Sequence, residues 1–329
     1  MIDFSFIIPL RNEEKFIKPC LDSLLKLDYP KSKYEIVIAE GKSTDKTRAI
    51  INDYSKNHKL IKIYNNTSGN TAIGRNVCVT KSQGKYLINY SGHVTVNPDF
   101  LKILKQEVTK IKGKLVGLGI SNISRTKKNQ SLFVKIANAS FDSFMGGSGL
   151  FLQNTKFNEE RLVEHMAFVV YKTDIFTELG IFDNEFWSGQ DSEFNYRLKT
   201  KGYKLLYTPK LCIFHNKRQI PKKTFQQLYR YGIARLKIIR KYRKSMKLHY
   251  LIPSGFVLGW LGIIILTLLS YIPLFVPLIL FALYCLICFI TTKSKSLIVK
   301  LGSIPFYLML NFSYGLGFIR GFFNDNLEW

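Results

Sequence analysis

Residues 4–47 read FSFIIPLRNEEKFIKPCLDSLLKLDYPKSKYEIVIAEGKSTDKT, a stretch in which two apolar runs flank a segment of helical periodicity. The runs Phe4–Leu10 and Tyr34–Glu40 each have the length of a buried strand. Between them, apolar residues of Asn12–Leu27 recur every three or four positions, as on one face of a helix. The stretch therefore predicts a strand, a helix and a second strand, which is the start of a βαβ unit.

The same alternation continues to residue 90 and then becomes less regular. The next elements are expected at Thr44–Tyr54 (helix), Leu60–Tyr64 (strand), Thr71–Lys81 (helix) and Lys85–Tyr90 (strand). Later helices are expected at Phe100–Ile111 and Asp191–Lys201, and later strands at Leu115–Ile120, Ala167–Tyr171 and Lys204–Tyr207. Lys127–Phe157 is rich in Gly, Ser and Asn and is expected to be partly loop. This order indicates an α/β fold with a parallel, doubly wound sheet.

The region from Leu251 to Ile319 is almost wholly apolar and differs from everything before it. Three of its segments approach the ~20 residues that a helix needs to cross a bilayer; they are Leu251–Ile272, Leu274–Ile290 and Leu297–Ile319. We therefore expect about three transmembrane helices. The expected organisation is a soluble domain over residues 1–216, a basic amphipathic segment over 217–250 and a membrane domain over 251–329.

The formal net charge of +25 is densest next to this apolar region. Twelve Lys and Arg residues, and no Asp or Glu, lie between Lys217 and Lys247. Within this block, Thr224–Lys247 has apolar residues broadly on one helical face and basic residues on much of the remainder. This pattern is typical of a helix on an anionic membrane surface, and a solvated linker helix is the alternative. A nucleic-acid-binding protein would interleave basic and aromatic residues over its soluble domain, so membrane lipids explain the charge better.

The five cysteines are dispersed, and no pair in the soluble part has the spacing of a metal or redox motif, which favours a reducing compartment. The first residues do not have the pattern of a signal peptide, so we expect the soluble domain to be cytoplasmic. The positive-inside rule agrees with a multi-pass membrane protein. It places Lys217–Lys247 and the lysines at 293, 295 and 300 inside, and the turn near Ile272 and the acidic segment Asp325–Glu328 outside.

Four groups of polar or small residues lie at the carboxyl ends of predicted strands. They are Pro9–Glu14, Glu40–Thr47, Gly74–Asn76 and Ser91–His93. Open α/β sheets bind their ligands at the carboxyl ends of the strands. We therefore expect these four groups to contribute to one ligand site.

Four longer stretches resemble glycosyltransferase family 2 enzymes with the GT-A fold. They are FSFIIPLRNEEKFIKPCLDSLL (residues 4–25), EIVIAEGKSTDKT (35–47), GNTAIGRNVCVTKSQGKYLINY (69–90) and FWSGQDSEFNYRLKTKGYKLLYTP (186–209). The His-containing fourth motif, the Gly146–Gly149 loop and the apolar tail are most similar to the branch that builds succinoglycan-like exopolysaccharides. The resemblance covers roughly residues 3–235.

The resemblance implies a nucleotide-sugar donor held at the strand ends. The implied donor-binding residues are Pro9, Arg11, Glu13, Glu40, Ser43, Asp45, Arg75, Ser91 and Gly92. Other roles remain open for some of them: Asp45 is also placed to cap the helix after it, and Glu13 to lie in a first helical turn. Arg75 is placed either to pair with phosphate or to hold carboxylates around the nucleotide.

The fourth motif departs from the family pattern. Most members place Asp-x-Asp there to bind the Mg²⁺ or Mn²⁺ that bridges the diphosphate, whereas this chain has Ser91-Gly92-His93. A serine hydroxyl is a weak ligand for a hard cation, and His93 suits Mn²⁺ better than Mg²⁺. His215 matches a late His of the family and is a candidate second ligand, or else a strand-end residue. Cationic side chains that neutralise the diphosphate are the alternative to a metal.

Asp191 matches the second residue of the family's Glu-Asp pair, which makes it the implied catalytic base. One such carboxylate fits an inverting displacement by an acceptor hydroxyl. The preceding Gln190 replaces the usual Glu. The expected acceptor and loop residues are Gly146, Gly147, Ser148, Gln190 and Arg230.

The implied activity is an inverting transfer of a sugar from a nucleotide-sugar to a membrane lipid-linked acceptor in polysaccharide or glycan assembly. The departures at Ser91 and Gln190 favour an alternative, a catalytically silent relative that binds nucleotide-sugar and acts as a scaffold.

Overall fold

A computed structural model describes residues 1–124, 131–147, 157–215 and 220–324. The chain forms two compact units, the first made of Met1–Arg125 with Thr155–Asn216 and the second of Thr126–Asn154 with Lys217–Trp329. The segment 126–154, which the sequence places within the first domain, is thus part of the second unit. Each unit is described by itself below.

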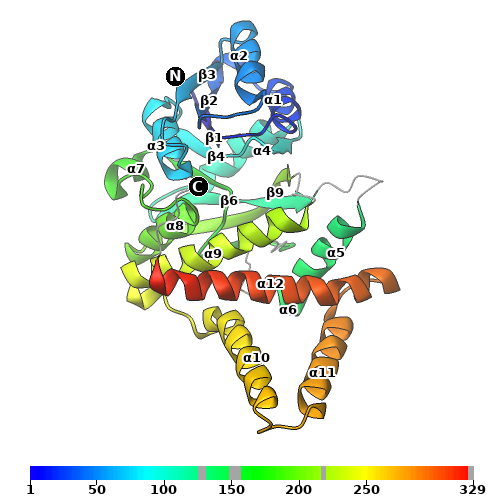
Figure 1. Ribbon diagram of the computed structural model, residues 1–329. Helices are drawn as coiled ribbons and strands as arrows, with labels where there is room; N and C mark the ends of the chain where they lie inside the picture. The colour runs from blue at the N-terminus through cyan, green and yellow to red at the C-terminus, as the bar shows by residue number, and fades with distance from the viewer. Residues whose placement is uncertain (125–130, 148–156, 216–219, 325–329) are drawn as a thin grey trace. The chain divides into compact units, whose positions relative to one another are not determined.

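The first unit is built on one sheet whose first four strands are parallel (Figure 1). These strands are β1 (Phe4–Leu10), β2 (Tyr34–Glu40), β3 (Ile61–Asn65) and β4 (Tyr86–Asn89), in the spatial order β3-β2-β1-β4. β1 and β2 are almost entirely buried, as expected for parallel strands that are covered on both faces. All four lie within one or two residues of the predicted ranges.

The second half of the sheet is mixed, which corrects the expectation of a wholly parallel sheet. It continues through β8 (Val169–Lys172), β6 (Leu115–Ser124), β9 (Lys204–His215) and β5 (Val94–Val96), and β7 (Arg161–Val163) pairs with β9. β8 is antiparallel to both β4 and β6. β8 therefore runs opposite to its two neighbours in the sheet.

Alternate residues of the central strands enter two separate cores. Phe4, Phe6 and Ile8 belong to one core, and Ile7 to the other, because successive side chains of a strand point to opposite faces. The first core also holds apolar residues of α1 (Ile17–Leu25), α2 (Thr47–Asn57) and α4 (Phe100–Glu107). The second core holds those of α3 (Thr71–Lys81), α7 (Asp174–Leu179) and α8 (Gln190–Thr200).

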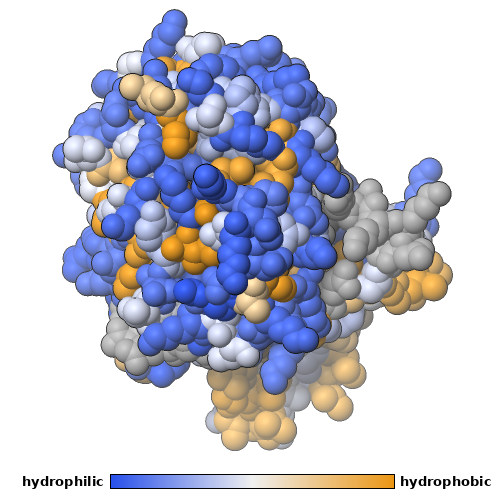
Figure 2. Space-filling model, turned by 90° about the horizontal axis from the view of Figure 1, so that it is seen from above, coloured by the Kyte–Doolittle hydropathy of each residue, from blue (hydrophilic) through white to orange (hydrophobic). Residues whose placement is uncertain are grey.

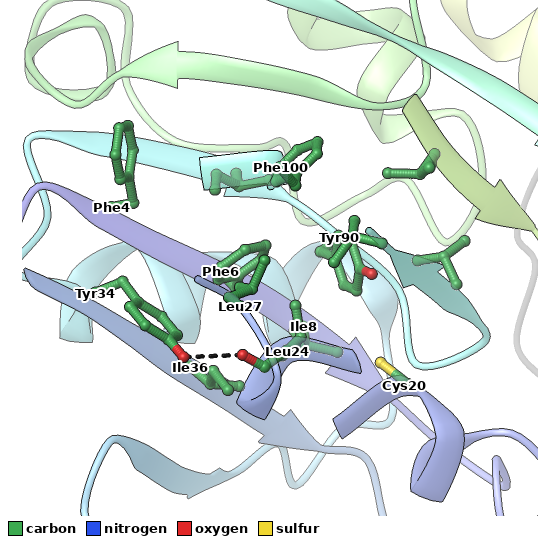
Figure 3. Close-up of a cluster of buried hydrophobic side chains, with 14 of the residues drawn as sticks. Phe4, Phe6, Ile8, Cys20, Leu24, Leu27, Tyr34, Ile36, Tyr90 and Phe100 are labelled. Atoms are coloured by element: carbon green, nitrogen blue, oxygen red, sulfur yellow. Dashed lines mark hydrogen bonds between the residues drawn. The ribbon is translucent and has the colours of Figure 1, made fainter. Parts of the chain in front are cut away.

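Figure 3 shows how the first core is closed. Phe6 contacts Tyr90 edge to face, and the Tyr34 hydroxyl donates to the Leu24 carbonyl at 2.8 Å. Hydrophilic residues cover most of the surface that Figure 2 turns to the viewer. α1 begins at Ile17 rather than at Asn12 as expected, so residues 11–16 are left to form a loop at the end of β1.

The second unit is helical. It contains α5 (Leu132–Phe141), α6 (Phe144–Gly147), α9 (Pro221–Lys241), α10 (Ile252–Leu268), α11 (Phe275–Thr291) and α12 (Leu297–Phe323). Three-residue and four-residue 3₁₀ turns at Arg243–Ser245 and Leu248–Leu251 connect α9 to α10. α5 and α6 lie in the stretch that the sequence predicts to be partly loop.

Two segments of the described chain are long and apolar enough to cross a membrane, Leu248–Leu268 and Leu297–Phe323. The third expected segment forms α11, an apolar helix of 17 residues that is shorter than these two. By length and composition, the described residues thus contain two candidate membrane helices, whereas the sequence predicts about three.

The apolar side of α9 is covered by α12, not left open for lipid as the amphipathic pattern suggested. Leu228 and Leu236 are buried in one cluster with Tyr314 and Phe318 of α12. Gly232 lets the two backbones approach, because a Cβ atom there would lie 2.6 Å from the Phe318 nitrogen. The apolar face of α9 therefore stabilises the second unit by packing within it.

Replacing Gly317 by alanine is expected to destabilise the second unit. A Cβ atom at Gly317 would lie 2.8 Å from the Tyr229 carbonyl carbon, and neither backbone can yield easily. We expect a loss of about 1–3 kcal/mol in the free energy of unfolding, as for an overpacked core. Gly259→Ala is the matched control, because nothing lies within 4 Å of a Cβ atom there. Thermal unfolding of the two variants checks this, and equal stability would contradict the backbone contact.

Glu107 connects α4 to β9 through a charged cluster. Its side chain is 4% exposed and accepts hydrogen bonds from Lys110 (2.7 Å) and Lys210 (3.2 Å). Burial raises the pKa of this carboxyl, but the two lysines outweigh that effect and hold the pKa below its usual value of 4.5. The folded state therefore favours the carboxylate.

Glu107→Gln is expected to lower the free energy of unfolding by about 1–2 kcal/mol at neutral pH, because hydrogen bonds to a charged group are lost. The loss stays moderate because water partly screens the partner lysines. Because the folded pKa is depressed, this contribution is present above the unfolded pKa and is lost as the pH falls through the folded pKa. Denaturant unfolding at pH 7 and at stepwise lower pH should show the difference from wild type shrinking below about pH 4.5. The exposed Glu159→Gln serves as control, and a difference that is independent of pH would refute the role of the charge.

Candidate functional site

The loop after β1 is fastened to the loop after β2. Asn12 adopts a left-handed backbone conformation (φ 56°), and its amide donates to the Ser43 hydroxyl at 3.0 Å. In return, the Thr44 amide donates to the Asn12 side-chain oxygen at 2.8 Å. Ser43, predicted to contact the donor, thus also holds these two strand-end loops together.

Asp45 links the same loops and supports the start of α2. Its carboxylate accepts from the Thr47 amide at 3.0 Å and from the Glu14 amide at 3.2 Å. Burial raises the pKa of Asp45, but the hydrogen bonds from Thr47 and Glu14 prevail and lower it. These contacts account for Asp45 as a capping residue, and its donor-binding role stays a prediction.

Glu40 ends β2 with a nearly buried carboxylate. One of its oxygens accepts from the Ser43 amide at 2.6 Å, and the other pairs with Arg48 at 3.1 Å. Arg48 also donates to Asn65, at the end of β3, at 2.8 Å. Glu40 therefore orders the ends of two neighbouring strands at the edge where a nucleotide is expected.

Glycines allow these loops to approach one another closely. A Cβ atom on Gly69, which has a φ of 71°, would lie 3.0 Å from the Arg11 guanidinium. A Cβ atom on Gly74 would lie 3.0 Å from the Pro9 ring. Arg11 thus lies over the turn after β3, and Pro9 lies against the first turns of α3. The structure brings both predicted donor-binding residues to the same strand-end edge.

His93, Glu13 and His215 come together at the start of β5. The Glu13 carboxylate lies 2.8 Å from His93 Nδ1, and the His93 and His215 rings meet edge to face with centroids 4.9 Å apart. β5 pairs with the end of β9, so Val94 is directly opposite His215. A Cβ atom on Gly92 would lie 3.4 Å from the Glu13 side chain. The sequence expectation that His93 and His215 are neighbours agrees with this geometry.

The chemistry of this group suits a divalent cation only in part. Imidazole nitrogens and a carboxylate are donors that Mn²⁺ accepts. Glu13 bound at Nδ1 leaves His93 Nε2 available as a ligand, which is the usual outer-shell arrangement of a metal-bound His. Within the described residues, however, no group of three or more His, Cys, Asp or Glu is arranged to hold a metal ion. Any ion here would need further ligands from substrate or water.

The charges of Asp191 and Arg75 both affect the pKa of one buried group, the Tyr171 hydroxyl. Burial is the main cause that raises the Tyr171 pKa, the Asp191 carboxylate raises it further, and the Arg75 guanidinium lowers it. Arg75 is itself nearly buried and lies over the Phe182 ring at 5.5 Å. The structure therefore brings the predicted base and the predicted phosphate-binding cation into electrostatic range of one hydroxyl.

α8 carries Asp191 in its first turn, immediately after the buried Gln190. Gly189 precedes the helix in a left-handed conformation (φ 77°), which turns the chain into α8. Asp191 Oδ1 accepts from the Ser192 amide at 2.9 Å. Asp191 is thus carried on a helix that packs into the second core through Phe194 and Leu198.

A polar cluster that the sequence reasoning missed holds the start of α8 to the sheet edge. Asn195 Nδ2 donates to the Met166 carbonyl at 2.9 Å, which fixes the amide so that Nδ2 also faces His165 Nδ1 at 3.1 Å. His165 Nε2 lies 3.3 Å from the Ser192 hydroxyl. The Asn89 amide, at the end of β4, donates to the Ala167 carbonyl at 2.9 Å. These bonds place Asp191 at the edge where β4 ends.

No spacing in the sequence could have found His165 or Asn195. Ligand-binding residues are expected after the carboxyl ends of strands, whereas His165 lies before the amino end of the antiparallel strand β8. Asn195 lies in the middle of α8 and reads as an ordinary helix residue.

Of the expected acceptor and loop residues, Gln190 belongs to the first unit and the others belong to the second. Gly146 and Gly147 end the helical turn α6, which corrects the expectation of a flexible loop there. A Cβ atom on Gly146 would lie 2.8 Å from the Ser140 carbonyl carbon, so this glycine is needed for tight packing on α5. Arg230 is half-buried in α9. Ser148 and Gly149 lie outside the described residues, and the acceptor roles remain predictions.

Comparison with protein families matches residues 5–180 to "Glycosyl transferase family 2" and residues 94–290 to "Glycosyl transferase family group 2". A relative from Methanococcus voltae is 34% identical over 87% of this chain and 94% of its own length. Its name is dolichyl N-acetyl-alpha-D-glucosaminyl phosphate 3-beta-D-2,3-diacetamido-2,3-dideoxy-beta-D-glucuronosyltransferase. The succinoglycan biosynthesis protein ExoA of Rhizobium meliloti is 24% identical over 75% of this chain and 73% of its own.

Among solved structures, the mannosyltransferase PcManGT from Pyrobaculum calidifontis, in complex with GDP-Man and Mn²⁺, has a TM-score of 0.63. It is 15% identical, and the match covers 94% of this chain and 86% of that one. This similarity shows the fold, and it agrees with the mixed sheet described above. The family match over more than half of the sequence and the close relative together show that this chain is a family 2 glycosyltransferase with the GT-A fold and with relatives among exopolysaccharide enzymes.

Proposed function

We propose that this enzyme transfers a sugar, with inversion, from a nucleotide-sugar to a lipid-linked acceptor at the cytoplasmic face of a membrane. The observation that carries the proposal is the position of Asp191. Asp191 lies in the first turn of a helix whose residues Ser192 and Asn195 contact the His165 cluster, and its carboxylate and Arg75 both influence the buried Tyr171 hydroxyl, which supports a role in the site.

In the proposed reaction, Asp191 removes the proton from the acceptor hydroxyl as the oxygen attacks the anomeric carbon. The bond to the nucleoside diphosphate breaks on the opposite side of the sugar, so the anomeric configuration inverts. A single carboxylate suffices as general base for such a displacement. The neighbouring Gln190 is a neutral amide and nearly buried, so it is not a second base.

The donor is proposed to lie across the loops that follow β1, β2 and β3. Arg11 and Arg75 are cations at this edge and are suited to the diphosphate, and Glu40 is a buried acceptor suited to a base or ribose. The structural neighbour PcManGT binds GDP-Man, which supports a nucleotide-sugar as the class of donor.

A divalent cation, Mn²⁺ before Mg²⁺, is proposed as cofactor. His93, with His215 and Glu13 beside it, would hold the ion, and the donor diphosphate would supply the remaining oxygen ligands. When bound, the cation would neutralise charge on the leaving diphosphate. Glu13 would orient the His93 ring, as outer-shell carboxylates do.

The lipid-linked acceptor is proposed from two observations. The second unit exposes apolar helices that are suited to a bilayer, and the Methanococcus voltae relative is named for a dolichyl-phosphate-linked sugar. A polyprenyl-phosphate or a growing lipid-linked oligosaccharide is the proposed class of acceptor, in the assembly of a polysaccharide or glycan.

Asp191→Asn is expected to lower transfer about 10²–10⁴-fold, the usual contribution of a general base. Asp174→Asn, also in the first turn of a helix and exposed, is the matched control and should keep full activity. The assay measures transfer from UDP- and GDP-sugars to polyprenyl-phosphate acceptors by the detergent-solubilised full chain. Full activity of Asp191→Asn would exclude it as base. Donor binding without transfer by the wild type would favour the scaffold alternative.

EDTA is expected to suppress transfer and Mn²⁺ to restore it. His93→Gln should raise the Mn²⁺ concentration needed for half-maximal activity and should weaken Mn²⁺ binding measured by electron paramagnetic resonance in the presence of donor, because the imidazole ligand is lost. His58→Gln, outside the site, is the control. Transfer that is insensitive to EDTA would instead indicate that cationic side chains neutralise the charge of the leaving diphosphate.

A further inference from the structure

α12 has two unlike faces. One face is buried within the second unit and includes Phe306, Leu310, Tyr314 and Phe318. The other face is an apolar stripe that is exposed or half-exposed, with members three or four residues apart; they are Ile298, Leu301, Pro305, Leu308, Phe312, Leu316, Ile319 and Phe323. Such spacing places the stripe along one side of the helix. The described charged residues of α12 are Lys300, near its start, and Arg320, near its end.

The buried face of α12 lies lengthwise on α9. Gly317 approaches the Tyr229 backbone, Gly321 approaches Leu236, and the Arg240 guanidinium donates to the Phe322 carbonyl at 2.8 Å. Successive positions on α9 thus meet successive positions on α12. The first half of α12 packs on α5, where Phe306 contacts Phe133 and Phe141.

The α10–α11 hairpin meets α12 near its base. Pro253 and Val257, in the first turns of α10, pack on Gly315, and the Thr292 hydroxyl, just after α11, lies 3.2 Å from the Tyr307 hydroxyl. From there the hairpin leaves α12 on the side away from α9 (Figure 1). Its far end is exposed and apolar, with Leu268 78% and Leu274 68% exposed. Phe312 of the stripe also contacts Phe256 of α10, so α12 packs on the base of the hairpin while the far end of the hairpin extends beyond it.

The hairpin and α12 differ in their charged residues. Residues 248–292 contain no Lys, Arg, Asp or Glu, whereas Lys247 precedes the hairpin and Lys293 follows it. Lys300 and Arg320 are about 30 Å apart along α12, at ~1.5 Å per residue, which is close to the ~30 Å of a hydrocarbon core. A transmembrane α12 would leave these two cations on opposite sides, against the tendency of basic residues to stay inside.

We propose that the α10–α11 hairpin enters the hydrocarbon region and that α12 lies along the cytoplasmic surface with its apolar stripe against lipid. This inference rests on the membrane attachment proposed above. It replaces the expected three crossings by one hairpin and one surface helix, and it places Asn324 on the same side as Lys247. The partner of the stripe is a bilayer, and the basic residues that flank it are suited to anionic headgroups.

Cysteine labelling tests the side of Asn324. Asn324→Cys and Lys247→Cys, both at exposed positions, are treated with a membrane-impermeant maleimide in intact cells and in inverted vesicles, and modified sites are identified by mass spectrometry. We expect both sites to be protected in cells and modified in inverted vesicles. Labelling of Asn324→Cys in cells while Lys247→Cys is protected would overturn the proposal. Recovery of the protein in the soluble fraction would overturn the attachment itself, which separates the two failures.

Depth measurements give a second readout. Nitroxide labels on cysteines at Leu301, Leu308 and Leu316 report collision with oxygen and with a water-soluble quencher in anionic vesicles. A surface helix predicts similar depths at all three positions. A label at Leu308 that lies much deeper in the bilayer than the labels at Leu301 and Leu316 would show that α12 crosses the bilayer, and would overturn the proposal.

Discussion

The parallel pairing of β1 with both β2 and β4 is the constraint on which the first unit, the catalytic unit of this glycosyltransferase, depends. Its register sets Leu10 opposite Glu40, so the loops after the two strands begin at the same level. The hydrogen bonds between Asn12 and the residues at 43 and 44 are possible only because of that register. Because β1 is buried on both faces, its side chains divide between two cores, and the helices that carry Arg75 and Asp191 pack on one of them.

The second unit depends on a different interaction, the close approach of helix backbones. Gly232, Gly315 and Gly317 remove side chains where α9, α10 and α12 meet. This contact means that the apolar side of the basic, amphipathic α9 is covered by α12. On the opposite side of α12, Phe312 contacts Phe256 of α10, and most other members of the apolar stripe are exposed or half-exposed.

Much of the catalytic unit could be predicted because its signals are local. The apolar runs of β1 and β2 are properties of a few consecutive residues, and the predicted ranges of β1, β2 and α3 match those observed. The longer β6 and β9, and the direction of β8, could not be predicted, because they depend on where the chain re-enters the sheet. The His165 cluster was missed for the same reason, since its bonds join residues about 30 positions apart.

The sequence by itself determined the family, the βαβ start, the loops at the strand ends and the apolar character of the last third of the chain. Each of these follows from residue type and spacing within a short window. The tertiary structure alone decided that Glu13 contacts His93, that Asp191 and Arg75 both influence the buried Tyr171 hydroxyl, and that α12 lies on α9. The physical reason is that hydrophobic periodicity specifies which face of a helix is buried but not which neighbour buries it, so only long-range packing selects the partner.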